Sequence, residues 1–249
     1  MTLWTLTRVI VPTSALCLVS LLAWLLTPTY AQSASTQDLS QQPPAPPSTP
    51  PLNDTRPGGG LAPDEISCGE LENGLQALIP VENPVLTTTP YPTFLFYVPA
   101  GAEAVPHGEF SVLLWPGEEV RHYRTRFTLP ESPGVVSITI PELPAHALTE
   151  DQIYRWYFHL YCGEDTNAQP DFTLRGAVQR VALTPERSQQ IQAASPAIWY
   201  DAIAHVASRL QASPQDSQLQ TTWRELMQSI DAEAAEAAPF AGSVLLIED

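Results

Sequence analysis

The chain of 249 residues contains no lysine. All eleven basic residues are arginines, against 27 carboxylates, so the net charge is −16. A chain this acidic has no electrostatic reason to bind nucleic acid or an anionic membrane surface. The acidity serves either solubility or the binding of cations.

Familiar signatures of catalysis and metal binding are also missing. The sequence has no nucleophile elbow, no C-x-x-C pair and no H-x-x-x-H pair. Paired acids such as Glu118-Glu119 lack the alternating ligand spacing of a calcium loop. We therefore predict no catalytic residue, no metal site and no cofactor.

One apolar run stands at the N-terminus. It spans residues 9–26, follows Arg8 and contains no charge. Small residues before Ala31 fit a cleavage site, so residues 1–31 are predicted to be a signal peptide. The run is close to the roughly 20 residues that span a bilayer, which leaves a retained anchor as the alternative. Either way the protein is expected to be exported, to the periplasm or cell envelope, with membrane contact only through this segment.

Cysteine is scarce after the leader, where only Cys68 and Cys162 remain. Two cysteines in an exported protein favour a disulfide over a zinc site, which needs more ligands. Two free buried thiols, or a catalytic thiolate without a recognisable histidine partner, are the alternatives.

Composition divides the rest of the chain. Residues 32–63 are rich in proline, glycine and serine and predict a disordered linker. Residues 64–183 alternate aromatic or β-branched residues with polar ones, which predicts a mainly β fold, an antiparallel sandwich of immunoglobulin or fibronectin type. The expected strands are 77–80, 93–98, 110–114, 120–129, 135–140, 154–161 and 172–183.

After Leu183 the period becomes helical. Thr184-Pro185 and Ser195-Pro196 are typical helix starts, and residues 184–230 predict a helical extension docked on the sandwich. Residues 231–249 predict an acidic, largely disordered tail, although its apolar run SVLLI could add a strand.

Alternation along the strands predicts a binding surface. His122, Arg124 and Arg126 fall on the outward face of one strand, and Arg155 and His159 could extend this row if the two strands are neighbours. Guanidinium groups bind carboxylates well, so the row is a candidate face for a protein partner or an acidic glycan. Alternatively, acids on adjacent strands pair with the arginines, or the helices with Glu225 cover them.

Other residues keep two further classes of function open. Exposed Trp115, Tyr157 and Tyr161 would favour a carbohydrate-binding module, whereas a hydrolase would need a deep pocket that gathers histidines and carboxylates. Asp201 and His205 are four residues apart on a helix, which predicts a surface pair rather than a catalytic dyad.

Several motifs occur in a fixed order: LQALIP, LTTTPYPTFLFYVP, YRTRFTLPESPGVVSITIP, YRWYFHLYC, VQRVALTPE and IWYDAIAHVASRL. In this order they resemble the cyanobacterial domain-of-unknown-function 928 (DUF928) family. The resemblance implies an exported envelope protein with a sandwich and C-terminal helices, and it supplies no activity or catalytic residue. We therefore expect a non-enzymatic, exported interaction module of the cell envelope that binds a protein partner.

Overall fold

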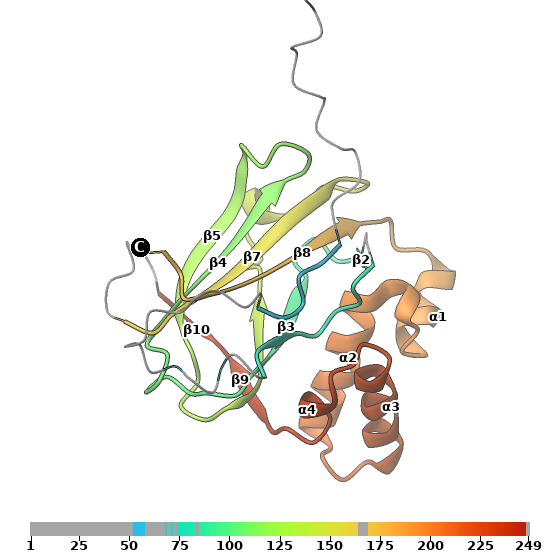
Figure 1. Ribbon diagram of the computed structural model, residues 1–249. Coiled ribbons are helices and arrows are strands. Elements are labelled where there is room, and N and C mark those ends of the chain that lie inside the picture. The colour runs from blue at the N-terminus through green and yellow to red at the C-terminus, as the bar shows by residue number, and fades with distance from the viewer. Residues whose placement is uncertain are drawn as a thin grey trace, which may run out of the picture. The chain divides into compact units, whose positions relative to one another are not determined.

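The described part of the chain consists of two β-sheets and a group of helices that lies between β8 and β9 in the sequence (Figure 1). The predicted signal peptide and most of the predicted linker lie outside the described residues. The computed structural model describes residues 52–57, 68, 71, 74–82, 85–163 and 169–247.

The larger sheet has six strands, and β4 and β7 lie at its centre. Its strand order is β10 (Leu245–Ile247), β5 (Arg121–Thr128), β4 (His107–Leu114), β7 (Ile153–Tyr161), β8 (Phe172–Arg180) and β2 (Val85–Thr87).

The smaller sheet has four strands. Its strand order is β1 (Gln76–Ala77), β3 (Thr93–Val98), β6 (Gly134–Thr139) and β9 (Phe240–Ser243). Four pairings are antiparallel, as the sequence predicts: β3 with β6, β4 with β5, β4 with β7, and β7 with β8. Two outer pairings, β2 with β8 and β6 with β9, are parallel and make both sheets mixed.

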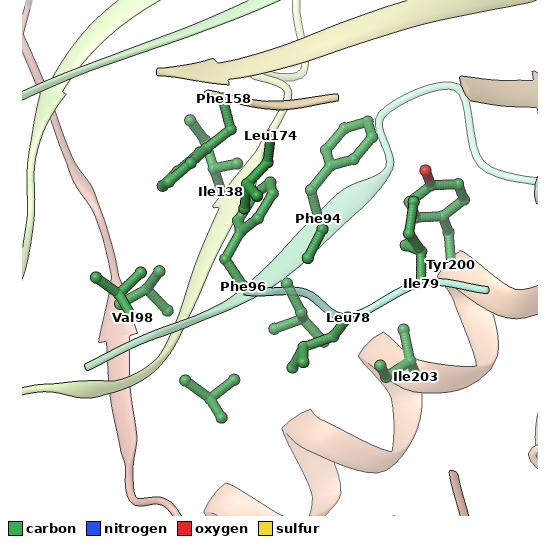
Figure 2. Close-up of a cluster of buried hydrophobic side chains, with 14 of the residues drawn as sticks. Leu78, Ile79, Phe94, Phe96, Val98, Ile138, Phe158, Leu174, Tyr200 and Ile203 are labelled. Carbon is green, nitrogen blue, oxygen red and sulfur yellow. The ribbon is translucent and has the colours of Figure 1, made fainter. Parts of the chain in front are cut away.

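Aromatic side chains fill the space between the sheets. Phe94 of β3 lies 4.9 Å from Phe110 of β4 between ring centroids, and Phe96 stacks on Phe158 of β7 at 4.0 Å. Figure 2 shows Phe94, Phe96 and Phe158 with Leu174 of β8 and Ile138 of β6 beside them. The inward alternation of these strands therefore produces a core shared by two sheets that pack face to face.

Helices follow β8, as the helical period predicts. Thr184 caps α1 by accepting a hydrogen bond from the backbone N–H of Arg187, and Asp216 caps α3 in the same way. Short 3₁₀ turns cover Pro144–His146 and Pro196–Ile198. The helices are α1 (Pro185–Gln192), α2 (Trp199–Ala212), α3 (Ser217–Gln228) and α4 (Glu233–Glu236).

Tyr200, at the start of α2, contacts both sheets. Its hydroxyl accepts a hydrogen bond from Trp156 Nε1 of β7 at 2.8 Å and donates one to the carbonyl of Ala177 in β8 at 3.3 Å. Its ring lies 5.1 Å from that of Phe94 in the smaller sheet. Next to it, Trp199 Nε1 donates to the carbonyl of Leu78 at 2.8 Å. These buried contacts fix the helical extension against the sandwich, where Tyr200 and Ile203 appear beside the core (Figure 2).

The C-terminal tail differs from the prediction of disorder. Phe240–Ser243 joins the smaller sheet as β9, Val244 is buried at the corner, and Leu245–Ile247 joins the larger sheet as β10. Each short strand supplies hydrogen-bond partners to an edge, β6 or β5, that would otherwise stay open. The apolar run SVLLI is thus part of the fold.

Part of the predicted linker is also ordered. Asp54 forms a β-bridge with Arg175, and the buried Asn53 accepts a hydrogen bond from the backbone N–H of Ala177 at 2.8 Å. These contacts satisfy backbone groups on the outer edge of β8. The folded unit therefore begins before residue 64.

Candidate functional site

The outward surface of the six-stranded sheet carries most of the residues that the sequence singles out. Because β4 lies between β5 and β7, the two predicted rows are not direct neighbours, and β4 adds its own side chains between them. We refer to this surface as the arginine face. It comprises Glu109, Arg121, Arg124, Arg126, Tyr157, His159 and Arg175.

The predicted row did not include Glu109, Arg121 or Arg175, and of these Glu109 lies on the central strand β4. In the strand register it lies opposite Arg126 of β5 on one side and His159 of β7 on the other. His159 in turn lies opposite Thr173 of β8. One row of polar side chains thus crosses four strands.

Arg124 forms an ion pair with Glu109. Its Nη2 lies 2.5 Å from Glu109 Oε2, and the carboxylate side chain is only 15% exposed. Burial raises the pKa of Glu109, but the hydrogen bond and charge of Arg124, with His159 and Arg121, outweigh it and hold the pKa below its ordinary value of 4.5. The expectation that an acid on the adjacent strand pairs with the arginines is therefore confirmed for Arg124.

Arg126 is in a different situation. Its guanidinium makes no hydrogen bond or ion pair with any residue that the structure describes. It borders a hollow of about 180 Å³ that combines charged, aromatic and aliphatic side chains. The lining consists of His107, Gly108, Glu109, Arg126, Phe127, Tyr161 and Ile247. A free guanidinium beside an apolar wall suits a ligand group that carries a carboxylate on an aliphatic stem.

Two contacts hold the His159 ring in place. Its Nδ1 is hydrogen-bonded to Thr173 Oγ1 at 2.9 Å, and its ring stacks on that of Tyr157 with 5.7 Å between centroids. Burial lowers the pKa of His159 below its ordinary 6.5, and the carboxylate of Glu109 offsets this only in part. His159 is therefore neutral at pH 7.

This lowered pKa predicts a pH dependence of stability. As the pH falls through 6.5 an unfolded chain protonates this histidine, whereas the lowered pKa means that the folded chain does so only at lower pH, so the free energy of unfolding should fall as the pH drops below 6.5. Replacement by glutamine should remove this part of the slope. NMR titration of the His159 ring should give a midpoint below 6.5, and a midpoint at or above 6.5 would contradict the burial argument.

His122 does not belong to the arginine face, contrary to the prediction. Val112 and Leu113 of β4 lie opposite Tyr123 and Arg121 of β5, so His122 is the extra residue of a β-bulge. Its Nε2 donates to the carbonyl of His146 at 3.1 Å, and its ring lies 4.9 Å from that of Tyr154. The bulge breaks the alternation on which the prediction depends.

Arg155 lies on the predicted strand, but its side chain is only 1% exposed. It is opposite Leu113 on one side and Ala177 on the other, two residues without charge. Its neighbours bury it, so it cannot contact a partner directly. This part of the predicted row is wrong, because alternation gives the face of a side chain and not what covers it.

The aromatic residues named from the sequence are largely covered. Trp115 is 8% and Tyr161 7% exposed. Tyr157 is half-buried, and its hydroxyl donates a hydrogen bond to Glu118. These rings do not form an open stacking platform.

Cys68 and Cys162 form a disulfide in the structure, as predicted. Their Cα atoms are 6.0 Å apart and 94 residues separate them in the chain. Cys68 is buried, and Cys162 directly follows β7. The bond therefore ties the segment before β1 to the end of a central strand of the larger sheet.

The sequence predicts a surface pair of Asp201 and His205 on this helix, but Asp201 has other partners in the structure. Its carboxylate accepts hydrogen bonds from Thr87 Oγ1 at 2.6 Å and from the backbone N–H of Thr88 at 2.7 Å. Asp201 thus joins α2 to the end of β2. Tertiary contacts, and not the spacing along the helix, select its partner.

The described residues contain no group of three or more His, Cys, Asp or Glu side chains placed to hold a metal ion. Their helices are all too short or too polar to cross a membrane.

Comparison with known proteins identifies a family and nothing closer. The model of the family named Domain of Unknown Function (DUF928) matches residues 54–240. The chain belongs to the DUF928 family. No curated protein and no solved structure matches it.

The DUF928 match agrees with the limits of the fold. It begins at Asp54, which bridges to β8, and it ends at Phe240, the first residue of β9. The matched range includes every residue of the arginine face, whereas β10 lies outside it. The DUF928 description assigns neither an activity nor a site.

Proposed function

We propose that this DUF928 protein is a non-enzymatic, exported module of the cell envelope that binds an acidic surface of a protein partner through the arginine face. The observation that carries the proposal is the guanidinium of Arg126, which has no hydrogen-bond or ion-pair partner among the residues that the structure describes and borders a partly apolar hollow. Such a group gains a hydrogen-bonded carboxylate when a partner supplies one.

The local charge supports this choice. β4 and β5 together contain three arginines and one carboxylate, Glu109, in a chain whose net charge is −16. Glu109 is already bound to Arg124, and no other carboxylate of the described residues pairs with Arg121 or Arg126. Because most of the protein repels acidic molecules, a positive patch of this kind selects the orientation in which an acidic partner approaches.

The hollow offers little for hydrolysis. It brings His107 and Glu109 together, the two residue types that a hydrolase would need. However, its lining contains no serine, threonine or cysteine, and the ion pair with Arg124 keeps Glu109 ionised. A carboxylate with a lowered pKa is a poor general acid or base at neutral pH.

A protein partner is also favoured over a glycan. Carbohydrate modules stack sugar rings on exposed aromatic side chains, whereas Trp115 and Tyr161 are buried and Tyr157 lies against His159. The features left open to a ligand are guanidinium groups and aliphatic side chains. These suit the carboxylates and methyl groups of a protein surface.

Site-specific photo-crosslinking tests the proposal. A photoreactive residue is placed at Arg121, which is exposed on the arginine face, or at Arg209, which is exposed on α2. After illumination in an envelope extract of the source cells, we expect a discrete protein adduct from position 121, and its yield should fall as salt is raised.

Position 209 is the control for non-specific crosslinking to other parts of the protein surface. Identical adducts from both positions, or a protein adduct from position 209 alone, would show that the arginine face is not the binding surface. Polysaccharide adducts in place of protein would favour a carbohydrate module.

A further inference from the structure

Strand β10 is an exposed apolar edge. It is the outermost strand of the six-stranded sheet and pairs with β5 only, in the described part of the chain. Its three side chains, Leu245, Leu246 and Ile247, are 64%, 43% and 41% exposed. Natural proteins usually protect such an edge with charge, proline or a covering element, and β10 itself contains neither charge nor proline.

Two other outer strands of the sandwich, β2 and β9, are covered. β2, at the opposite edge of the same sheet, packs against α2 and is joined to it through Asp201. β9, at the edge of the smaller sheet, has the ring of Phe240 against Trp223 of α3, 5.0 Å between centroids. The apolar edge at β10 is therefore a local feature and not a general property of this fold.

The edge is continuous with the arginine face. Ile247 lies opposite Arg126 in the strand register, and both residues line the same hollow. A strand added beside β10 would run about 4.8 Å away from it. Alternate side chains of that strand would lie next to Ile247 and within reach of the long Arg126 side chain, while the others would lie beside Leu246 on the opposite surface.

We propose that β10 accepts an extended segment of the protein partner as an additional strand, and that this segment alternates acidic and apolar side chains. The inference rests on the proposed function, because Arg126 selects the acidic side chains. Backbone hydrogen bonds to the free edge supply affinity, and the alternation supplies specificity. Charge complementarity with Arg126 distinguishes this occupant from an apolar strand or from a second copy of β10.

The probe is a short synthetic peptide that alternates valine and glutamate, and its control alternates valine and lysine. Amide hydrogen exchange of the full chain is measured with each peptide. The glutamate peptide should slow exchange at one or more amides of Leu245–Ile247 by about tenfold or more, because strand addition hydrogen-bonds amides that now face solvent. The lysine peptide should leave exchange unchanged.

Two lysine substitutions separate the edge from general hydrophobicity. Leu246→Lys should weaken binding of the glutamate peptide by about tenfold, since a charge on an edge strand opposes pairing. Val120→Lys is the matched control, because Val120 is also an exposed apolar residue, in the turn between β4 and β5 and away from β10. It should leave binding unchanged.

The outcomes distinguish this inference from the proposed function. If the peptide binds through Arg126 without protecting β10, strand addition is wrong and the arginine face remains the binding surface. If the peptide does not bind, strand addition is also wrong. The crosslinking experiment then still tests independently whether the arginine face binds a protein partner. Protection of β10 without peptide, together with a dimer in sedimentation, would identify a second copy as the occupant and overturn the inference.

Discussion

Replacing Cys68 and Cys162 by serine is expected to lower the free energy of unfolding by up to about 4.7 kcal/mol, the value for a loop near 100 residues. The disulfide closes a long loop that contains strands β1 through β7. Its removal therefore greatly increases the conformational freedom of the unfolded chain. Denaturant titration of the oxidised wild type and the double variant measures the difference.

Reduction provides the control for this first prediction. Dithiothreitol should shift the wild-type midpoint to that of the double variant and leave the variant unchanged. If the wild type and the variant unfold at the same denaturant concentration, the disulfide does not stabilise the fold. The single variants would then show whether burial of Cys68, and not the bond, matters at this position.

Replacing Tyr200 by alanine should cost about 3–5 kcal/mol, the usual range for a large buried aromatic side chain. Tyr200 is 1% exposed and fills the space between Phe94 and Trp156, which belong to different sheets. Its loss leaves a cavity where α2 meets the sandwich. It also leaves the indole N–H of Trp156 without the acceptor that it has in the structure.

Two substitutions make this second prediction specific. Tyr200→Phe keeps the ring and removes the hydroxyl, so it should cost about 1–3 kcal/mol through the unsatisfied indole and carbonyl groups. Gln211→Ala, at an exposed position of α2, should change stability by less than about 0.5 kcal/mol. Denaturant titration measures all three variants, and equal losses in Tyr200→Ala and Gln211→Ala would contradict the docking of α2 through Tyr200.

Alternation along β7 could be predicted because each strand has one buried face. Trp156, Phe158 and Leu160 are buried as expected, and the hairpin of β4 and β5 forms at Pro116-Gly117. The same argument could not reveal that β4 lies between β5 and β7, since strand order depends on long-range pairing. It also missed the bulge at His122, which has no sequence signature of its own.

Glu109 was missed for a local reason. Pro106, His107 and Gly108 are typical of a turn, so the sequence prediction began this strand at Phe110, whereas β4 begins at His107. Gly108 in fact permits close packing: a Cβ atom there would lie 2.2 Å from the ring of Phe127. A glycine that could indicate a turn is required inside the strand, and this places Glu109 next to Arg126.

The C-terminal strands could be predicted only in part. The apolar run SVLLI indicates a strand, but its short length and acidic surroundings favour disorder. What orders it is the pairing of Leu245–Ile247 with β5, residues far away in the sequence. The free edge that this pairing creates is the basis of the strand-addition proposal.

The central claim is that Arg126 binds an acidic protein partner. It is tested most directly by measuring the affinity of the crosslinked partner for variants in which one arginine is replaced by the uncharged glutamine. Arg126→Gln removes the guanidinium of the arginine face that borders the hollow, and Arg209→Gln removes an exposed guanidinium from α2. The account predicts that Arg126→Gln raises Kd about tenfold, equivalent to about 1.4 kcal/mol, while Arg209→Gln leaves it unchanged. Equal affinities of the wild type and Arg126→Gln would contradict the account.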